Sequence, residues 1–314
     1  MPSFMTASFI KKWIIRLIPL GIVAALAAWF LSAPQYLEKN EIAKMEAGDA
    51  SKGESVFWPG GCGSCHAVKN ATGDEKKKLG GGHALKTPVG TFYTPNISPD
   101  NKTGIGNWTG AEFANAMVKG VSPNGSHYFP SFPYTSYARM NMEDIADLWA
   151  YMKTLPVVKR ENESHDLSLL FSVRRGVGLW KTIFLSPDPV AKIDESNEQL
   201  MRGRYLVEGA GHCAECHTPR SLFGLGGTLK SAWLSGGPSP EGIGKIPNIT
   251  PHSSGSGAWS ADEISEYLAT GFTPDFDSVG GSMVSVQQNM AKLTKQDRDA
   301  IAAYLKAIAP IETK

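Results

Sequence analysis

Two C-x-x-C-H pentapeptides contain all four cysteines of the chain. The first begins at Cys62 and ends at His66, and the second begins at Cys213 and ends at His217. With this spacing, both thiols can add to the vinyl groups of one porphyrin while the adjacent histidine ligates its iron, which is the attachment chemistry of a c-type haem. The predicted haem-binding residues are Cys62, Cys65, His66, Cys213, Cys216 and His217.

Other uses of paired cysteines explain this pattern less well. A zinc ribbon also contains two C-x-x-C pairs, but its four thiolates converge on one metal and usually lie closer together in the sequence. A thioredoxin-like redox pair needs neither the histidine nor a second copy. Because no cysteine is left over for a disulfide, the sequence predicts two covalently bound haem c groups as the cofactors.

The composition is that of a globular, exported protein. A chain of 314 residues is long enough for two domains, and its formal net charge of +1 gives no electrostatic reason to expect nucleic acid as a partner. Haem is attached to such motifs on the outer face of the bacterial cytoplasmic membrane. The motifs therefore also predict a periplasmic location.

Residues 1–34 have the pattern of a membrane anchor. Lys11, Lys12 and Arg16 precede an apolar run over residues 17–31. An apolar helix of nearly bilayer length, with basic residues on its N-terminal side, predicts a single transmembrane helix that has its N-terminus in the cytoplasm. We therefore expect a single-pass protein of the bacterial cytoplasmic membrane, in contact with lipid, with its haem domains in the periplasm.

A cleaved signal peptide is the alternative interpretation of this segment. Small residues at 31–33 offer a cleavage site, but Pro34 follows it, and proline is unfavourable directly after a cleavage point. Trp29 and Phe30 are also apolar where a signal peptide normally becomes polar. These residues favour an uncleaved anchor.

The rest of the chain is an internal repeat. Three kinds of landmark recur with a constant offset of 151 positions, so two copies of one domain follow each other. The landmarks are Cys62, Trp108 and Gly120 in the first copy and Cys213, Trp259 and Gly271 in the second. We expect domains over residues 45–158 and 196–310. The connector, 159–195, is expected to pack across the two domains or to dock a partner or lipid.

Helix signals recur in both copies, and strand-like alternation is absent, which predicts two small all-α domains. The expected capping boxes are Ser51 to Glu54, Thr109 to Glu112, Ser196 to Gln199 and Ser260 to Glu263. The last helix of each copy starts near Asn141 or Thr294 and stops before Pro156 or Pro310.

Glycines in the first helix of each copy predict a close helix crossing. Gly53 and Gly203 occupy equivalent places ahead of the two C-x-x-C-H motifs, next to aromatic residues. A residue without a side chain lets another helix approach its backbone, so we expect both glycines at helix contacts.

Three further segments of the first copy support a family resemblance. They are residues 94–100 (TPNISPD), 103–108 (TGIGNW) and 132–140 (FPYTSYARM). Together with the haem motifs and the terminal helices, they resemble the class I cytochrome c fold and, more narrowly, the multihaem cytochrome subunits of bacterial membrane-bound alcohol and gluconate dehydrogenases. The likeness covers essentially residues 45–310. Those relatives commonly carry three haem domains, whereas this chain has two.

The sixth iron ligand is expected to be methionine, because a haem that only carries electrons is usually closed on both faces. In the first copy, elimination leaves Met140 and Met142, and the resemblance implies Met140. In the second copy, Met283 lies in a glycine-rich loop and Met290 lies near the start of the last helix. We predict Met140 and Met283 as the distal ligands. The alternative for any one methionine is simple core packing.

The remaining histidines are expected to be surface or loop residues. They are His83, His127, His165, His212 and His252. Bis-histidine ligation through His127 or His252 is the rival to methionine. The carbonyl of Pro219 is a candidate to orient the proximal ring of His217. Candidate neighbours of the haem propionates are Trp108, Arg139, Arg220 and Trp259.

Two functions are compatible with a dihaem chain. As an electron carrier, and not an enzyme, it would accept electrons from a periplasmic or membrane-bound dehydrogenase or a quinol-oxidising complex and pass them to a terminal oxidase or a soluble cytochrome. A dihaem peroxidase would instead need one open haem with an acid or base above it. Since each copy has its own candidate methionine, the sequence favours the carrier.

Overall fold

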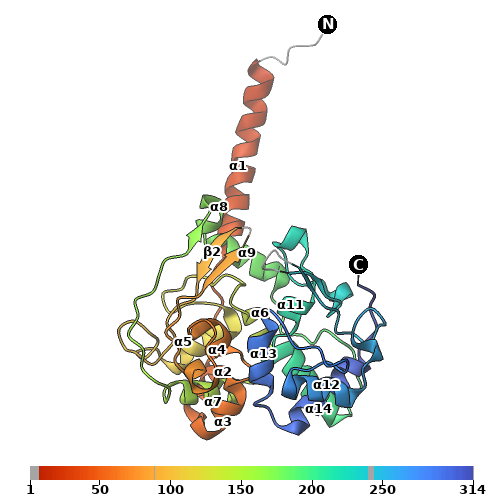
Figure 1. Cartoon of the computed structure of the whole chain (residues 1–314). Helices are drawn as coiled ribbons and strands as arrows, with labels where there is room; N and C mark the ends of the chain where they lie inside the picture. Colours follow the sequence, from red (N-terminus) through yellow and green to blue (C-terminus); the bar gives the residue numbers. More distant parts are fainter. Residues whose placement is uncertain (1–6, 88, 240–243, 314) are drawn as a thin grey trace.

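Figure 1 shows a computed structural model of the chain, in which a long helix projects from a body made of two helical halves. The structure describes residues 7–87, 89–239 and 244–313, with the backbone only at 7–15 and 170. Helix α1 (Ala7–Leu31) forms the projection. The helices of the first half are α2 (Lys39–Ala43), α3 (Ala50–Phe57), α4 (Cys62–His66), α5 (Gly110–Ala114), α6 (Tyr134–Tyr137) and α7 (Met142–Met152).

The second half repeats this arrangement after a helical connector. The connector holds α8 (Leu169–Ser172) and α9 (Arg175–Phe184). The helices of the second half are α10 (Glu198–Arg204), α11 (Ala214–His217), α12 (Ala261–Thr270), α13 (Met283–Met290) and α14 (Lys295–Ala307). Single turns of π-helix follow α5 at Asn115–Lys119 and α10 at Tyr205–Ala210. The 3-10 turns are η1 (Lys44–Ala47), η2 (Gly73–Lys77), η5 (Leu222–Gly224), η6 (Lys230–Ala232) and η7 (Ser256–Ala258).

Each half has its own apolar core, built around a close crossing of its first and last long helices. In the first half α3 crosses α7, and in the second α10 crosses α14. A Cβ atom on Gly53 would lie 2.1 Å from the carbonyl oxygen of Asp147, and one on Gly203 would lie 2.0 Å from that of Ala300. The predicted role of both glycines is therefore confirmed.

The capping predictions are partly right. Thr109 and Ser260 form the expected capping boxes, and Thr294 caps the last helix through its side chain. The boxes expected at Ser51 and Ser196 are wrong. Asp49 and Asn197 cap those helices instead, since their side chains accept from the amides of Ser51 and Leu200.

Strands are present, contrary to expectation, although they are short. In the first half β1 (Ala84–Thr87), β2 (Gly90–Tyr93) and β3 (Asp166–Leu167) form an antiparallel sheet in the order β1-β2-β3. In the second half β4 (Gly237–Pro238) pairs with β5 (Lys245–Ile246). These segments are too brief to show alternation in the sequence, and their pairing depends on how loops meet. The fold is otherwise helical, as expected.

The connector contacts both halves, as predicted. On α9, the Lys181 ammonium donates to the carbonyl of Gly120, and the Trp180 indole donates to the carbonyl of Leu225. The same helix holds the end of α1, because the Arg175 guanidinium donates to the carbonyl of Trp29.

The expected transmembrane helix is not confirmed. Over the described ranges, no helix is both long and apolar enough to cross a membrane.

Candidate haem sites

Both C-x-x-C-H motifs fold into a short helix. The first motif is helix α4, and the second begins at Cys213, which caps α11. Cys62 and Cys213 are half-buried, whereas Cys65 and Cys216 are exposed, and none of the four forms a disulfide. No disulfide therefore competes with thioether formation at either motif.

The proximal histidines are held identically in the two halves. The Nδ1 atom of His66 lies 2.8 Å from the carbonyl oxygen of Pro95, and that of His217 lies 2.8 Å from the carbonyl oxygen of Pro247. A carbonyl can only accept, so Nδ1 carries the proton and Nε2 keeps its lone pair. Burial also lowers the pKa of both imidazoles, which favours the neutral form that ligates a metal. The donor set fits two c-type haem irons.

The partner of His217 differs from the one expected. Its acceptor is Pro247 rather than Pro219, because the Nδ1 side of the ring faces the loop that carries residues 247–251. The corresponding first-half loop, 95–99, supplies Pro95 to His66. The tripeptide Pro-Asn-Ile occurs in both copies, at 95–97 and 247–249. This repeat is the sequence signal that could have identified the contact.

A buried asparagine after each of these prolines holds the loop in place. Asn96 donates to the carbonyl of Val158 at 2.7 Å and accepts from the amide of Ser98. Asn248 donates to the carbonyl of Ile311 at 2.7 Å and accepts from the amide of Thr250. Each asparagine thus ties its proline loop to the segment after the last helix. These positioning residues were missed from the sequence.

The structure places Met140 and Met142 together in the buried core of the first half. Met140 follows α6, and Met142 is the first residue of α7. In the second half Met283 is half-buried at the start of α13, whereas Met290 is buried in the core cluster. Ligation by Met140 and Met283 stays a prediction.

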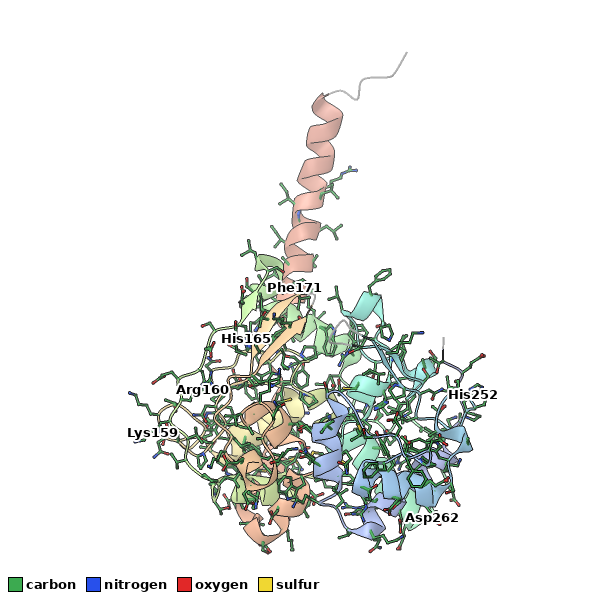
Figure 2. The ribbon with its side chains drawn as sticks, viewed as in Figure 1. Lys159, Arg160, His165, Phe171, His252 and Asp262 are labelled. Carbon is green, nitrogen blue, oxygen red and sulfur yellow. The ribbon has the colours of Figure 1, made fainter. Side chains whose placement is uncertain are left out.

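His127 lies in the loop before α6, as expected, but it is buried there and not at the surface. Its Nε2 atom lies 2.8 Å from the carbonyl oxygen of Ser32, and its Nδ1 atom lies 3.2 Å from the ammonium of Lys181. Because both ring nitrogens have protein partners, His127 is poorly suited to ligate iron. His252 lies on the outer side of the second half, away from α11 and α13, and its Nδ1 bonds Ser254 (Figure 2). These placements disfavour the bis-histidine alternative.

His165 and His212 have structural roles in the described part of the chain. His165 lies near the base of α1 (Figure 2), where its ring contacts Phe92 and its Nδ1 accepts from the amide of Tyr93. The ring of His212 packs edge-on against Tyr137, with centroids 5.7 Å apart, across the boundary between the halves.

The residues suggested for the propionates already have protein partners. Arg139 donates to the carbonyls of Asp188 and Thr135, and Arg220 pairs with the carboxylate of Glu215. Trp108 and Trp259 pack against the apolar cores. Their proposed contact with the propionates stays a prediction.

Comparison with known proteins identifies the family. The cytochrome c family model matches residues 50–156 and 200–309. A protein named diheme cytochrome c-type, from Cereibacter sphaeroides, is 50% identical over 293 residues, which are 93% of this chain and 97% of the relative.

Two further relatives belong to dehydrogenases. The gluconate 2-dehydrogenase cytochrome c subunit of Pantoea cypripedii is 35% identical over 85% of this chain and 62% of its own length. The alcohol dehydrogenase (quinone) cytochrome c subunit of Gluconobacter oxydans is 33% identical over 90% of this chain and 60% of its own length. The chain therefore spans less than two thirds of these two subunits.

The family match, the two C-x-x-C-H motifs and the geometry of the two proximal histidines agree with one another. The family model covers well over half of the chain, and the Cereibacter relative is matched along nearly its whole length. The chain belongs to the cytochrome c family and is a dihaem electron-transfer protein, not an enzyme, with two covalently bound haem c groups.

Proposed function

We propose that this cytochrome accepts electrons from a periplasmic or membrane-bound dehydrogenase, or from a quinol-oxidising complex, and delivers them to a terminal oxidase or a soluble cytochrome. The observation that carries this proposal is the equivalence of the two proximal sites, His66 with Pro95 and His217 with Pro247. Two equivalent sites suit one-electron carriage better than a division into a catalytic haem and a donor haem. The relatives named as dehydrogenase subunits support a dehydrogenase as the donor.

We propose Met140 and Met283 as the distal ligands that close the two irons. Met140 lies between α6 and the final helix of the first half, and Met283 is the first residue of α13, the helix before the final one of the second half. When bound, each haem supplies a one-electron Fe(III)/Fe(II) couple, and a thioether ligand raises its reduction potential. A closed iron keeps peroxide and other small ligands away.

The proposed location is the periplasmic face of the bacterial cytoplasmic membrane, with lipid in contact with α1. Large apolar side chains of α1 are 53–70% exposed in this structure. Such a surface is unfavourable in water and is typical of a segment that is buried in lipid or protein. The exposed side chains are Leu17, Ile18, Leu20, Ile22, Val23, Leu26, Trp29, Phe30 and Leu31.

The proposal is tested in membrane vesicles from cells that lack this chain. Oxygen uptake is measured with an alcohol, gluconate and fructose as separate electron sources, and then again after the wild-type chain is restored. We expect restoration to increase uptake with at least one substrate, whereas a Cys213→Ala/Cys216→Ala chain should not. Unchanged uptake with every substrate, combined with rapid turnover of peroxide by the purified protein, would replace the carrier with a peroxidase.

A further inference from the structure

The first haem-attachment helix contacts a helix of the other half. Ser64 occupies the third position of the first C-x-x-C-H motif. Its hydroxyl oxygen accepts from the Ser285 hydroxyl at 2.9 Å and from the side-chain amide of Asn289 at 3.0 Å. Both partners lie on α13, whose first residue is Met283. The attachment site of the first haem therefore bonds the segment that carries the predicted distal ligand of the second.

A buried lysine strengthens this contact. Lys76, at 2% exposure, donates from its ammonium to the carbonyl and hydroxyl oxygens of Ser285, at 2.8 and 2.9 Å, and to the side-chain oxygen of Asn289 at 2.8 Å. Its own backbone rests on the attachment helix, because a Cβ atom on Gly63 would lie only 2.5 Å from the Lys76 carbonyl oxygen. Lys76 thus connects α4 to both turns of α13.

The reverse contact exists on the other side of the boundary. Glu215 occupies the third position of the second C-x-x-C-H motif, equivalent to Ser64. Its carboxylate accepts from the hydroxyls of Thr135 at 2.5 Å and Ser136 at 2.9 Å. These hydroxyls belong to α6, which leads directly into Met140. Figure 1 shows α6, α11 and α13 together along the boundary between the halves.

We propose that each haem domain positions the distal ligand of the other. Lys76 and Ser64 fix α13 and so hold Met283 at the second haem, while Glu215 fixes α6 and so holds Met140 at the first. The iron–thioether bond requires the sulfur to stay at one place, and contacts outside the ligand itself supply that constraint. This inference rests on the proposed methionine ligands.

The decisive experiment is Lys76→Met in the full-length dihaem protein. We expect the ferric protein to lose about half of its near-infrared sulfur-to-iron band, and the reduced protein to bind about one carbon monoxide per chain where the wild type binds none. The altered haem must be the second, as shown by agreement with the difference spectrum of Met283→Ala rather than Met140→Ala. Lys78→Met is the control, since the ion pair that Lys78 forms among the described residues is an exposed one with Glu75.

A second pair of variants tests the reverse contact. Glu215→Ala keeps both cysteines and the histidine of its motif, yet it should open the first haem and not the second. Glu215→Gln retains an oxygen that can accept from both hydroxyls, so it should keep the first haem closed. Should Lys76→Met fold poorly, Asn289→Ala removes two of the same contacts and should give the same spectral change at the second haem.

The outcomes separate this inference from the proposed function. If Lys76→Met and Asn289→Ala lower the melting temperature but leave both sulfur bands intact, or if Lys76→Met opens the first haem and Glu215→Ala opens the second, cross-positioning is wrong and the carrier function stands. If the wild-type protein itself binds carbon monoxide, one haem is open and the proposed closed carrier is wrong. The proposed positioning of the distal methionine at that haem is then wrong as well.

Discussion

The two haem domains hold their proximal histidines in the same way but meet each other through different chemistry. Both histidines donate to a proline carbonyl at 2.8 Å. At the boundary, however, the first domain supplies the buried ammonium of Lys76, whereas the second supplies the carboxylate of Glu215, which also pairs with Arg220.

This difference shows which features a duplicated domain can vary. Each domain must bind its own haem, so the residues around the iron recur in both copies. The faces that meet must be complementary rather than identical, so they can diverge. Equivalent backbone hydrogen bonds place Leu234 where the first domain has Leu79, so the position equivalent to Lys76 is Ser231, which is exposed.

The largest expected effect comes from removing one attachment site. Cys213→Ala/Cys216→Ala should leave one covalent haem per chain, and Cys62→Ala/Cys65→Ala should leave the other, because each motif binds its haem through its own thioethers. Haem that resists acid-acetone extraction is quantified per chain. Loss of both haems in either variant would show that the sites are not independent.

The next effect concerns the distal ligands. Met283→Ala should lower the reduction potential of the second haem only, and Met140→Ala that of the first, because a thioether favours ferrous iron. Potentiometric titration of each variant checks this. An unchanged titration for Met140→Ala, with a change for Met142→Ala, would move the first ligand to Met142 and leave the comparison otherwise intact.

The buried asparagines test whether the proximal loops are equivalent. Asn96→Ala and Asn248→Ala should each lower the free energy of unfolding by roughly 2–4 kcal/mol, since each leaves buried polar groups without partners. Denaturant titration measures the loss. Asn107→Ala is the control, because Asn107 makes one hydrogen bond at an exposed site, and should cost less than about 1 kcal/mol. A large loss at only one of the two buried sites would break the equivalence.

The glycines at the helix crossings should respond similarly in both domains. Gly53→Ala and Gly203→Ala force a methyl group against a facing backbone carbonyl, which should destabilise each domain by about 1–3 kcal/mol. Gly176→Ala on α9 is the matched control, because nothing lies within 4 Å of the new Cβ atom. It should raise stability slightly, by up to about 1 kcal/mol. Thermal melts that show no loss for Gly53 or Gly203 would contradict the crossing geometry.

The smallest effect is a pH dependence on the Lys76 side of the boundary. Burial lowers the pKa of Lys76 to about 8, below that of the unfolded chain. Between these values the unfolded state binds more protons, so the free energy of unfolding should rise with pH above about 8, by on the order of 1 kcal/mol by about pH 9. Denaturant titrations at several pH values should show this slope, and Lys76→Met should reduce it. An equal slope in both proteins would assign it to another group, such as Lys181.

Local patterns predicted those parts of the fold that depend on neighbouring residues. The capping boxes at Thr109 and Ser260 and the crossing glycines followed from short motifs. The caps of the first helix in each half were mispredicted. The hydroxyls of Ser51 and Ser196 donate to the carboxylates of Asp49 and Asp194 in turns at or just before the start of these helices, and do not cap them. Where several neighbouring residues could each cap a helix, the sequence does not show which one does, because the choice depends on the backbone conformation.

The haem chemistry itself was determined by the sequence, because two thiols and a histidine within five residues need only one helical turn to face one porphyrin. The tertiary structure alone decided which carbonyl orients each histidine and how the domains meet. Lys76 and Ser285 are 209 residues apart, and Glu215 and Thr135 are 80 apart. Contacts across such separations depend on how two folded surfaces pack, which no local spacing specifies.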